Sequence, residues 1–158
     1  MLPIHLILSG PQEAPYPNGG DEAYWMGQVA GALAAHLHAG GLSLAWGLPQ
    51  GADGFTLALS SQASPPQREG RQKGPALLWR PGDALGRRAA EAIAFQLAQV
   101  YPQPELITLE EAPLESLPGP GVAVYLLYRD NPQDEAWLAR SAGASGKALA
   151  QGLGSLDG

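Results

Sequence analysis

The sequence predicts an α/β fold: a single domain over residues 1–158, with a mixed, mostly parallel, twisted sheet and helices on both faces. Three observations lead to this prediction. Short apolar runs typical of buried strands alternate with amphipathic helical stretches. Hydrophobic residues make up 45% of the chain and charged residues 15%, which supplies ample side chains for one core. Neither an internal repeat nor a second core is evident, and the length suits one domain.

The chain begins with a predicted strand followed by a predicted helix. Residues 4–9 are an apolar run that Gly10 interrupts, so a buried strand feeding a loop is expected. Asp21 is placed to cap a helix that ends at Gly40. The apolar residues of this helix recur at the spacing of one helical face: Met26, Val29, Ala30, Leu33 and Leu37.

Two further strands are expected at 42–46 and 55–60. Residues 47–54 between them are too few for the crossover helix that joins parallel neighbours. The two strands are therefore either an antiparallel pair or separated in the sheet.

A basic loop, a strand and a helix are expected in the middle of the chain. Residues 65–74 are rich in Pro, Gln, Arg and Lys, which predicts a solvated loop. A strand at 76–80 precedes a helix that Asp83 caps and that ends before Pro102. The loop holds the only dense basic run of the chain: Arg68, Arg71 and Lys73.

The last strand and helix have the clearest signals. Residues 121–128 are the most strand-like run of the chain. Asn131 and Pro132 occupy the favoured cap and first positions of a helix. Gly143 and Gly146 are expected to let this helix lie close against the sheet.

Charge and composition argue against several classes of function. The net charge of −6 disfavours binding to nucleic acid or to anionic lipid, because the average field repels phosphates. Without cysteine the chain has no disulfide, thiolate nucleophile or cysteine metal site. The N-terminal apolar run is too short for a signal sequence or a membrane span, so no membrane partner and a cytoplasmic location are expected.

Three sequence strings resemble zinc-dependent N-acetylmuramoyl-L-alanine amidases, which cleave the bond between muramic acid and L-alanine in peptidoglycan. Residues 128–138 and 146–153, YRDNPQDEAWL and GKALAQGL, are similar to the family's ending "hDNPEDAkWl…GKAIAkGi". Residues 20–30 are similar to "GTEE…MNqIA", in which a glutamate in the first turn of the helix ligates zinc. Residues 56–63 are similar to a strand that ends "SIHsNA" and presents a zinc histidine.

The resemblance implies that most of the catalytic residues are replaced. Glu22 matches the glutamate ligand, whereas Ser60 stands in place of one zinc histidine and Ala14 in place of the other. Tyr125 stands where the family has its general base. The resemblance therefore implies no bound zinc, no catalytic residue, and a candidate cleft lined by Glu22, Ser60, Gln62 and Tyr125.

The residues themselves single out Glu22 independently of the family. Glu22 precedes Met26 by four residues, so it belongs to the buried stripe, where a carboxylate needs compensation. The alternative is that it only complements the helix dipole. The histidines His5, His36 and His38 are expected to be core or surface residues, and no motif places a histidine base beside Ser60 or Ser61.

Three hypotheses follow. The first is an inactive amidase homologue that binds a peptidoglycan fragment or precursor, or else a protein partner, in a binding or regulatory role. The second is an active zinc amidase with displaced ligands such as Glu13 or Asp21. The third is a structural or oligomeric protein whose apolar segments 77–79 or 126–128 form an interface.

Overall fold

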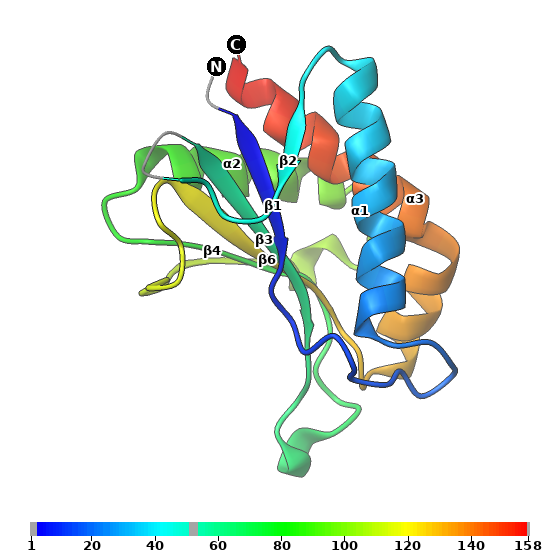
Figure 1. Cartoon of the computed structure of the whole chain (residues 1–158). Coiled ribbons are helices and arrows are strands. Elements are labelled where there is room, and N and C mark those ends of the chain that lie inside the picture. The colour runs from blue at the N-terminus through cyan, green and yellow to red at the C-terminus, as the bar shows by residue number, and fades with distance from the viewer. Residues whose placement is uncertain (1–2, 51–53, 158) are drawn as a thin grey trace.

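The computed structural model describes residues 3–50 and 54–157, which form one six-stranded sheet and three α-helices (Figure 1). The strands are β1 (Ile4–Leu8), β2 (Leu44–Trp46), β3 (Phe55–Gln62), β4 (Ala76–Trp79), β5 (Thr108–Glu111) and β6 (Gly121–Tyr128). The helices are α1 (Glu22–Ala39), α2 (Ala84–Leu97) and α3 (Pro132–Gly154). Strand β5 lies in the connection between α2 and β6 and was not predicted.

The sheet is mixed and mostly parallel, as predicted. Its strand order is β2-β1-β3-β6-β4-β5, and only the β4/β6 pair is antiparallel. Strands β2 and β3 lie on opposite sides of β1, and both are parallel to it. They are therefore separated in the sheet, which was one of the two expected arrangements, and are not an antiparallel pair.

The α/β class is confirmed, but the placement of the helices differs from the prediction. All three helices contribute to one hydrophobic cluster, which contains the alternate strand residues Leu6, Leu57 and Val124. Helix α3 lies between α1 and α2 and packs against both (Figure 1). Helices on both faces are therefore not found in the described part of the chain, because right-handed crossovers from β1 to β2 and from β4 to β5 place α1 and α2 on the same face.

Glycines in α3 allow this close helix packing. A Cβ at Gly146 would lie 2.5 Å from the carbonyl oxygen of Val29, and one at Gly152 would lie 2.6 Å from Cγ1 of Ile93. Gly146 therefore packs against α1 rather than against the sheet as predicted. Gly143 has no neighbour within 4 Å and makes no close approach.

The second face of the sheet carries a smaller apolar cluster of Ala58, Leu117 and Ala123. The Arg80 guanidinium donates hydrogen bonds to the carbonyl oxygens of Leu117 and Gly119. These bonds hold the loop that precedes β6 against this face. Segments 77–79 and 126–128 run through the sheet, and most of their side chains are buried, so they do not form an exposed interface. Among the described residues, no helix is both long and apolar enough to cross a bilayer.

Candidate functional site

The first turn of α1 places Glu22 in the interior. Asp21 caps the helix as predicted, because its Oδ1 accepts a hydrogen bond from the backbone N–H of Tyr24 at 2.8 Å. Glu22 follows directly, and its exposed fraction is 0%. It lies on the helix face of Met26, which confirms that Glu22 belongs to the buried stripe.

Two hydroxyl groups and one backbone amide surround the Glu22 carboxylate. The Tyr16 hydroxyl donates to Oε1 at 2.8 Å, and the Ser61 hydroxyl donates to the same oxygen at 2.6 Å. The backbone N–H of Ser61 donates to Oε2 at 2.9 Å. These contacts compensate the burial of the charge, so Glu22 does more than complement the helix dipole.

Arg129 supplies a cation beside this network. Its Nη1 donates to the Ser61 hydroxyl oxygen at 3.1 Å, so Ser61 lies between the guanidinium and the carboxylate. The network joins the 10–20 loop, α1, the end of β3 and the turn between β6 and α3.

The Tyr16 hydroxyl is a permanent donor. Burial raises the pKa of Tyr16 well above that of a free tyrosine, and the negative charge of Glu22 adds to the rise. The phenol therefore keeps its proton at neutral pH and donates a hydrogen bond to Glu22. Sequence reasoning missed Tyr16, because its contact depends on the path of the loop that precedes α1.

Ser61, rather than Ser60, contacts Glu22. The pairing of β3 with β6 shifts register between Ser60 and Gln62. The Ser60 hydroxyl donates instead to the carbonyl oxygen of Ser61 at 2.6 Å. An irregularity of this kind changes the direction of side chains at the end of a strand, and the sequence carries no signal for it.

The backbone of Gly10 passes close to the Glu22 carboxylate and leaves no room for a side chain. A Cβ at this position would lie 2.1 Å from Oε2 of Glu22 and 2.8 Å from Oγ of Ser60. Glu22 and Ser60 are thus brought together around the backbone of Gly10. Any larger residue at position 10 would have to displace the carboxylate.

The other residues expected in the cleft have different contacts. The carbonyl oxygen of Ala14 accepts the backbone N–H of Glu22 at 2.9 Å, and the carbonyl oxygen of Gln62 accepts that of Arg129. Tyr125 is the strand partner of Ser60, and its side chain packs against the apolar cluster on the second face. Ala14 and Gln62 therefore contribute backbone carbonyl groups next to the site.

The acids of the C-terminal motif anchor neighbouring loops. Asp130 accepts the backbone N–H groups of Ser64 and Gly70 at 2.9 and 2.8 Å. Burial alone would raise the pKa of Asp130, but these hydrogen bonds outweigh it, and the pKa lies below its ordinary value. Glu135 accepts the backbone and side-chain amides of Asn18 at 2.7 and 2.8 Å.

A zinc ion does not fit these residues. Within residues 3–50 and 54–157, no group of three or more His, Cys, Asp or Glu side chains could hold a metal. Three donors already occupy the Glu22 carboxylate, which leaves it poorly available as a ligand. His36 and His38 lie in the last turn of α1, at the opposite end of the helix from Glu22.

Comparison with known proteins shows the fold. No family model matches the chain, and neither does any curated protein sequence. Solved structures do match. The CwlD amidase from Clostridioides difficile, in complex with the GerS lipoprotein, has a TM-score of 0.80 at 9% identity, over 99% of this chain and 98% of CwlD.

Two further structures give the same result. The catalytic domain of the CD27L endolysin targeting Clostridia difficile has a TM-score of 0.77 at 15% identity, with 98% of each chain covered. The N-acetylmuramoyl-L-alanine amidase AmiC2 of Nostoc punctiforme has a TM-score of 0.73 at 15% identity, over 99% of this chain and 98% of AmiC2. The chain has the fold of the N-acetylmuramoyl-L-alanine amidases, which confirms the resemblance at the level of structure.

Proposed function

We propose that this protein is a non-hydrolytic member of the amidase fold that binds a peptidoglycan fragment or precursor without cleaving it. One observation carries the proposal. The carboxylate that matches the family's zinc ligand, Glu22, is buried and hydrogen-bonded to Tyr16 and Ser61 instead of facing a set of histidines.

Hydrolysis in the zinc amidases would need more than one retained ligand. A catalytic zinc takes three protein ligands and an open position, where bound water is activated and the amide carbonyl is polarised. Ser60 and Tyr125 bring no imidazole or carboxylate to the positions where the resemblance expects a ligand and the base. Among the residues described, Glu22 alone remains of that set.

The displaced ligands proposed for an active enzyme do not gather around Glu22. Oδ1 of Asp21 accepts the helix-capping hydrogen bond from the backbone N–H of Tyr24. Glu13 is exposed on the loop. A serine mechanism is also unsupported, since Ser61 is 2% exposed and its neighbours are Glu22 and Arg129 rather than a histidine base.

A protein partner is the second candidate. It is favoured by the structure of CwlD in complex with the GerS lipoprotein, because a protein of this fold forms a protein complex there. In this candidate the chain has a regulatory role, and its ligand is a protein surface instead of a cell-wall fragment.

Measurements of zinc content and of peptidoglycan hydrolysis test whether the protein has lost zinc-dependent amidase activity. The protein is purified without chelator, and zinc is measured by elemental analysis before and after dialysis with added zinc. Release of soluble fragments from purified peptidoglycan is followed in parallel. We expect zinc well below stoichiometric and no hydrolysis. A stoichiometric zinc with zinc-dependent release of fragments would overturn the proposal.

Binding is tested separately by co-sedimentation with insoluble peptidoglycan. We expect the protein to sediment with intact sacculi and to be released by soluble muropeptides. If sedimentation fails in every preparation, the cell-wall ligand is wrong and the protein-partner candidate remains. An unrelated acidic protein of similar size serves as the control for trapping.

A further inference from the structure

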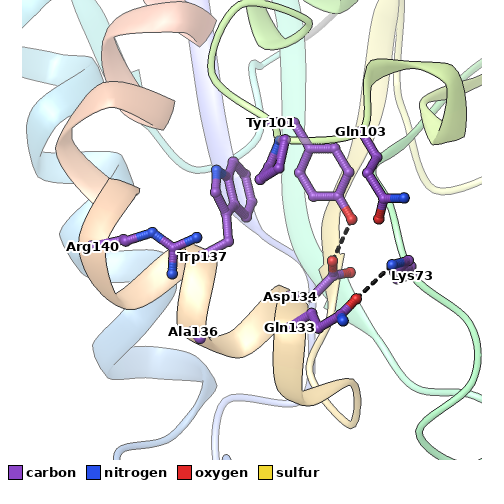
Figure 2. Close-up of a pocket in the computed structure, with 9 residues that line it drawn as sticks. Lys73, Tyr101, Gln103, Gln133, Asp134, Ala136, Trp137 and Arg140 are labelled. Atoms are coloured by element: carbon purple, nitrogen blue, oxygen red, sulfur yellow. Dashed lines mark hydrogen bonds between the residues drawn. The ribbon is translucent and has the colours of Figure 1, made fainter.

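A cavity lies away from the Glu22 network, beside the first turns of α3 (Figure 2). Its volume is about 420 Å³, within the range of small-molecule sites. Residues from three segments line it: the basic loop before β4, the chain after α2, and α3. They are Lys73, Tyr101, Pro102, Gln103, Gln133, Asp134, Ala136, Trp137 and Arg140.

The aromatic wall of this cavity is fixed in place. The rings of Tyr101 and Trp137 meet edge to face, with centroids 4.9 Å apart and an interplanar angle of 83°. Trp137 Nε1 donates to the carbonyl oxygen of Val100 at 3.0 Å, and the Tyr101 hydroxyl donates to Asp134. The rings are only 4% and 2% exposed, so they form a preformed, rigid base of the cavity rather than an open face for a ligand.

The one carboxylate that lines the cavity is already satisfied. Asp134 accepts the backbone N–H groups of Gly74 and Tyr128 at 2.9 and 3.0 Å, in addition to the Tyr101 hydroxyl. Burial is the largest cause of the raised pKa of Tyr101, and the charges of Asp134 and Glu105 add to it. The side chain of Glu105 is exposed, so water screens its charge. Acidic groups therefore contribute little free acceptor capacity to the cavity.

The remaining polar side chains of the cavity are two cations, Lys73 and Arg140, and two amides, Gln103 and Gln133. Lys73 donates a hydrogen bond to Oε1 of Gln133. In the view of Figure 2, Lys73 and Gln103 lie at one side of the two rings and Arg140 at the other. Two unit positive charges thus flank an aromatic wall in a chain whose net charge is −6.

The basic loop is held against α3, which keeps Lys73 at the cavity. Asp130 and Asp134 bind backbone amides of Gly70 and Gly74, which lie on either side of the lysine. The Asn131 side-chain amide also donates to the carbonyl oxygen of Gly70. The sequence predicted only a solvated loop here, but the structure fixes one of its cations over a cavity.

We propose that this cavity binds a small oxyanion, a carboxylate or a phosphate, on the side of the rings where Lys73 lies. Lys73 holds the anion and the amides of Gln103 and Gln133 orient it. Arg140, on the other side of the rings, adds positive potential, and the buried Tyr101 and Trp137 rings form the rigid base of the cavity. The inference does not rest on the function proposed above, because no residue of the Glu22 network takes part.

Calorimetric titration of the full chain at low salt tests the site, with inorganic phosphate, citrate and benzoate as probes. Phosphate and citrate distinguish the two sources of the anion, and benzoate tests a carboxylate attached to a ring. The variants are Lys73→Gln, Arg140→Gln and the double variant. Arg88→Gln, an exposed cation on α2 outside this cavity, is the matched control.

We expect saturable binding of at least one probe, weakened roughly tenfold by Lys73→Gln, less by Arg140→Gln and most by the double variant, as for one charge-assisted contact and one more distant cation. Arg88→Gln should leave the affinity unchanged, and circular dichroism should show that all variants are folded. Absence of binding by every probe, or affinities that the double variant does not change, would overturn the proposal.

Discussion

Glu22 is the residue on which the polar contacts of the candidate site converge. Its replacement by alanine leaves the hydroxyls of Tyr16 and Ser61 and the amide of Ser61 buried without an acceptor. We expect Glu22→Ala to lower the free energy of unfolding by about 3–5 kcal/mol and Glu22→Gln by about 1–3 kcal/mol. Urea unfolding followed by circular dichroism measures both changes.

The control for this prediction is Glu13→Ala, which removes an exposed acid from the same loop region. It should change the free energy of unfolding by less than about 0.5 kcal/mol. A Glu22→Ala variant more stable than the wild type would show that the carboxylate strains the fold. In that case Glu22 would be retained for a ligand and not for its hydrogen bonds.

The sequence could predict where Glu22 lies but not what surrounds it. Burial of Glu22 follows from helical periodicity, which depends only on residues four apart. Its partners Tyr16 and Ser61 depend on the path of an irregular loop and on a register shift at the end of β3. These features arise from tertiary packing, and no spacing in the sequence encodes them.

At the scale of elements, the packing of α3 against α1 depends on a glycine. A Cβ at Gly146 would lie 2.5 Å from the Val29 carbonyl oxygen and 2.7 Å from the Leu33 amide nitrogen, both backbone atoms that cannot move aside. We expect Gly146→Ala to cost about 1–3 kcal/mol of stability, because the two helices must separate. Thermal and urea unfolding measure the loss.

Gly143 in the same helix provides the matched control. No atom lies within 4 Å of the position of its Cβ, so alanine meets no obstacle there. Gly143→Ala should raise stability by about 0.5–1 kcal/mol, because alanine favours the helix. Equal effects of the two substitutions would contradict the close packing of α1 and α3.

The hydrogen bonds between Asp130 and the basic loop predict that the free energy of unfolding depends on pH. Backbone hydrogen bonds hold the pKa of Asp130 below its ordinary value, so folding favours the ionised form. This stabilisation is fully present above the pKa of about 4 that Asp130 has in the unfolded chain. It is lost as the pH falls through the lower pKa that Asp130 has in the folded protein. Asp130→Asn should cost about 1–3 kcal/mol at neutral pH, with a smaller difference from wild type in acid.

Unfolding measured at neutral and at acid pH tests this linkage. Asparagine keeps the size of the side chain but has one acceptor oxygen instead of two, so a loss that is equal at both pH values would indicate the missing acceptor rather than the charge. Backbone hydrogen exchange at Ser64 and Gly70 provides a local readout, because their N–H groups lose a charged acceptor. Faster exchange confined to this loop is the expected pattern.

The sheet shows how far element patterns determine a whole fold. Strand runs and helix caps predicted the α/β class, and the parallel majority of the sheet followed from it. The face on which each helix packs did not follow, since a helix pattern reports that one side is apolar and not which sheet face it covers. The strand order decides the face, because right-handed crossovers from β1 to β2 and from β4 to β5, in strands of opposite direction, place α1 and α2 on the same side of the sheet.

At the scale of the molecule, buried tyrosines set the alkaline limit of stability. Burial, as the largest cause, raises the pKa of Tyr16, Tyr101 and Tyr128 above the ordinary value. The pKa of each tyrosine in the folded protein exceeds its value of about 10 in the unfolded chain. The contribution of these tyrosines to the free energy of unfolding is therefore complete below that pH and declines as the pH rises beyond it. We expect the free energy of unfolding to fall steeply in the alkaline range.

The double variant Tyr16→Phe/Tyr101→Phe tests this origin of the alkaline limit. It loses hydroxyl hydrogen bonds to Glu22 and Asp134 and should be less stable than wild type at neutral pH. Its stability should nevertheless fall less steeply above pH about 10, because two fewer phenols must remain protonated. Tyr24→Phe, at a residue that is 53% exposed, should keep the wild-type slope. If the double variant keeps that slope as well, groups other than these tyrosines determine the alkaline unfolding.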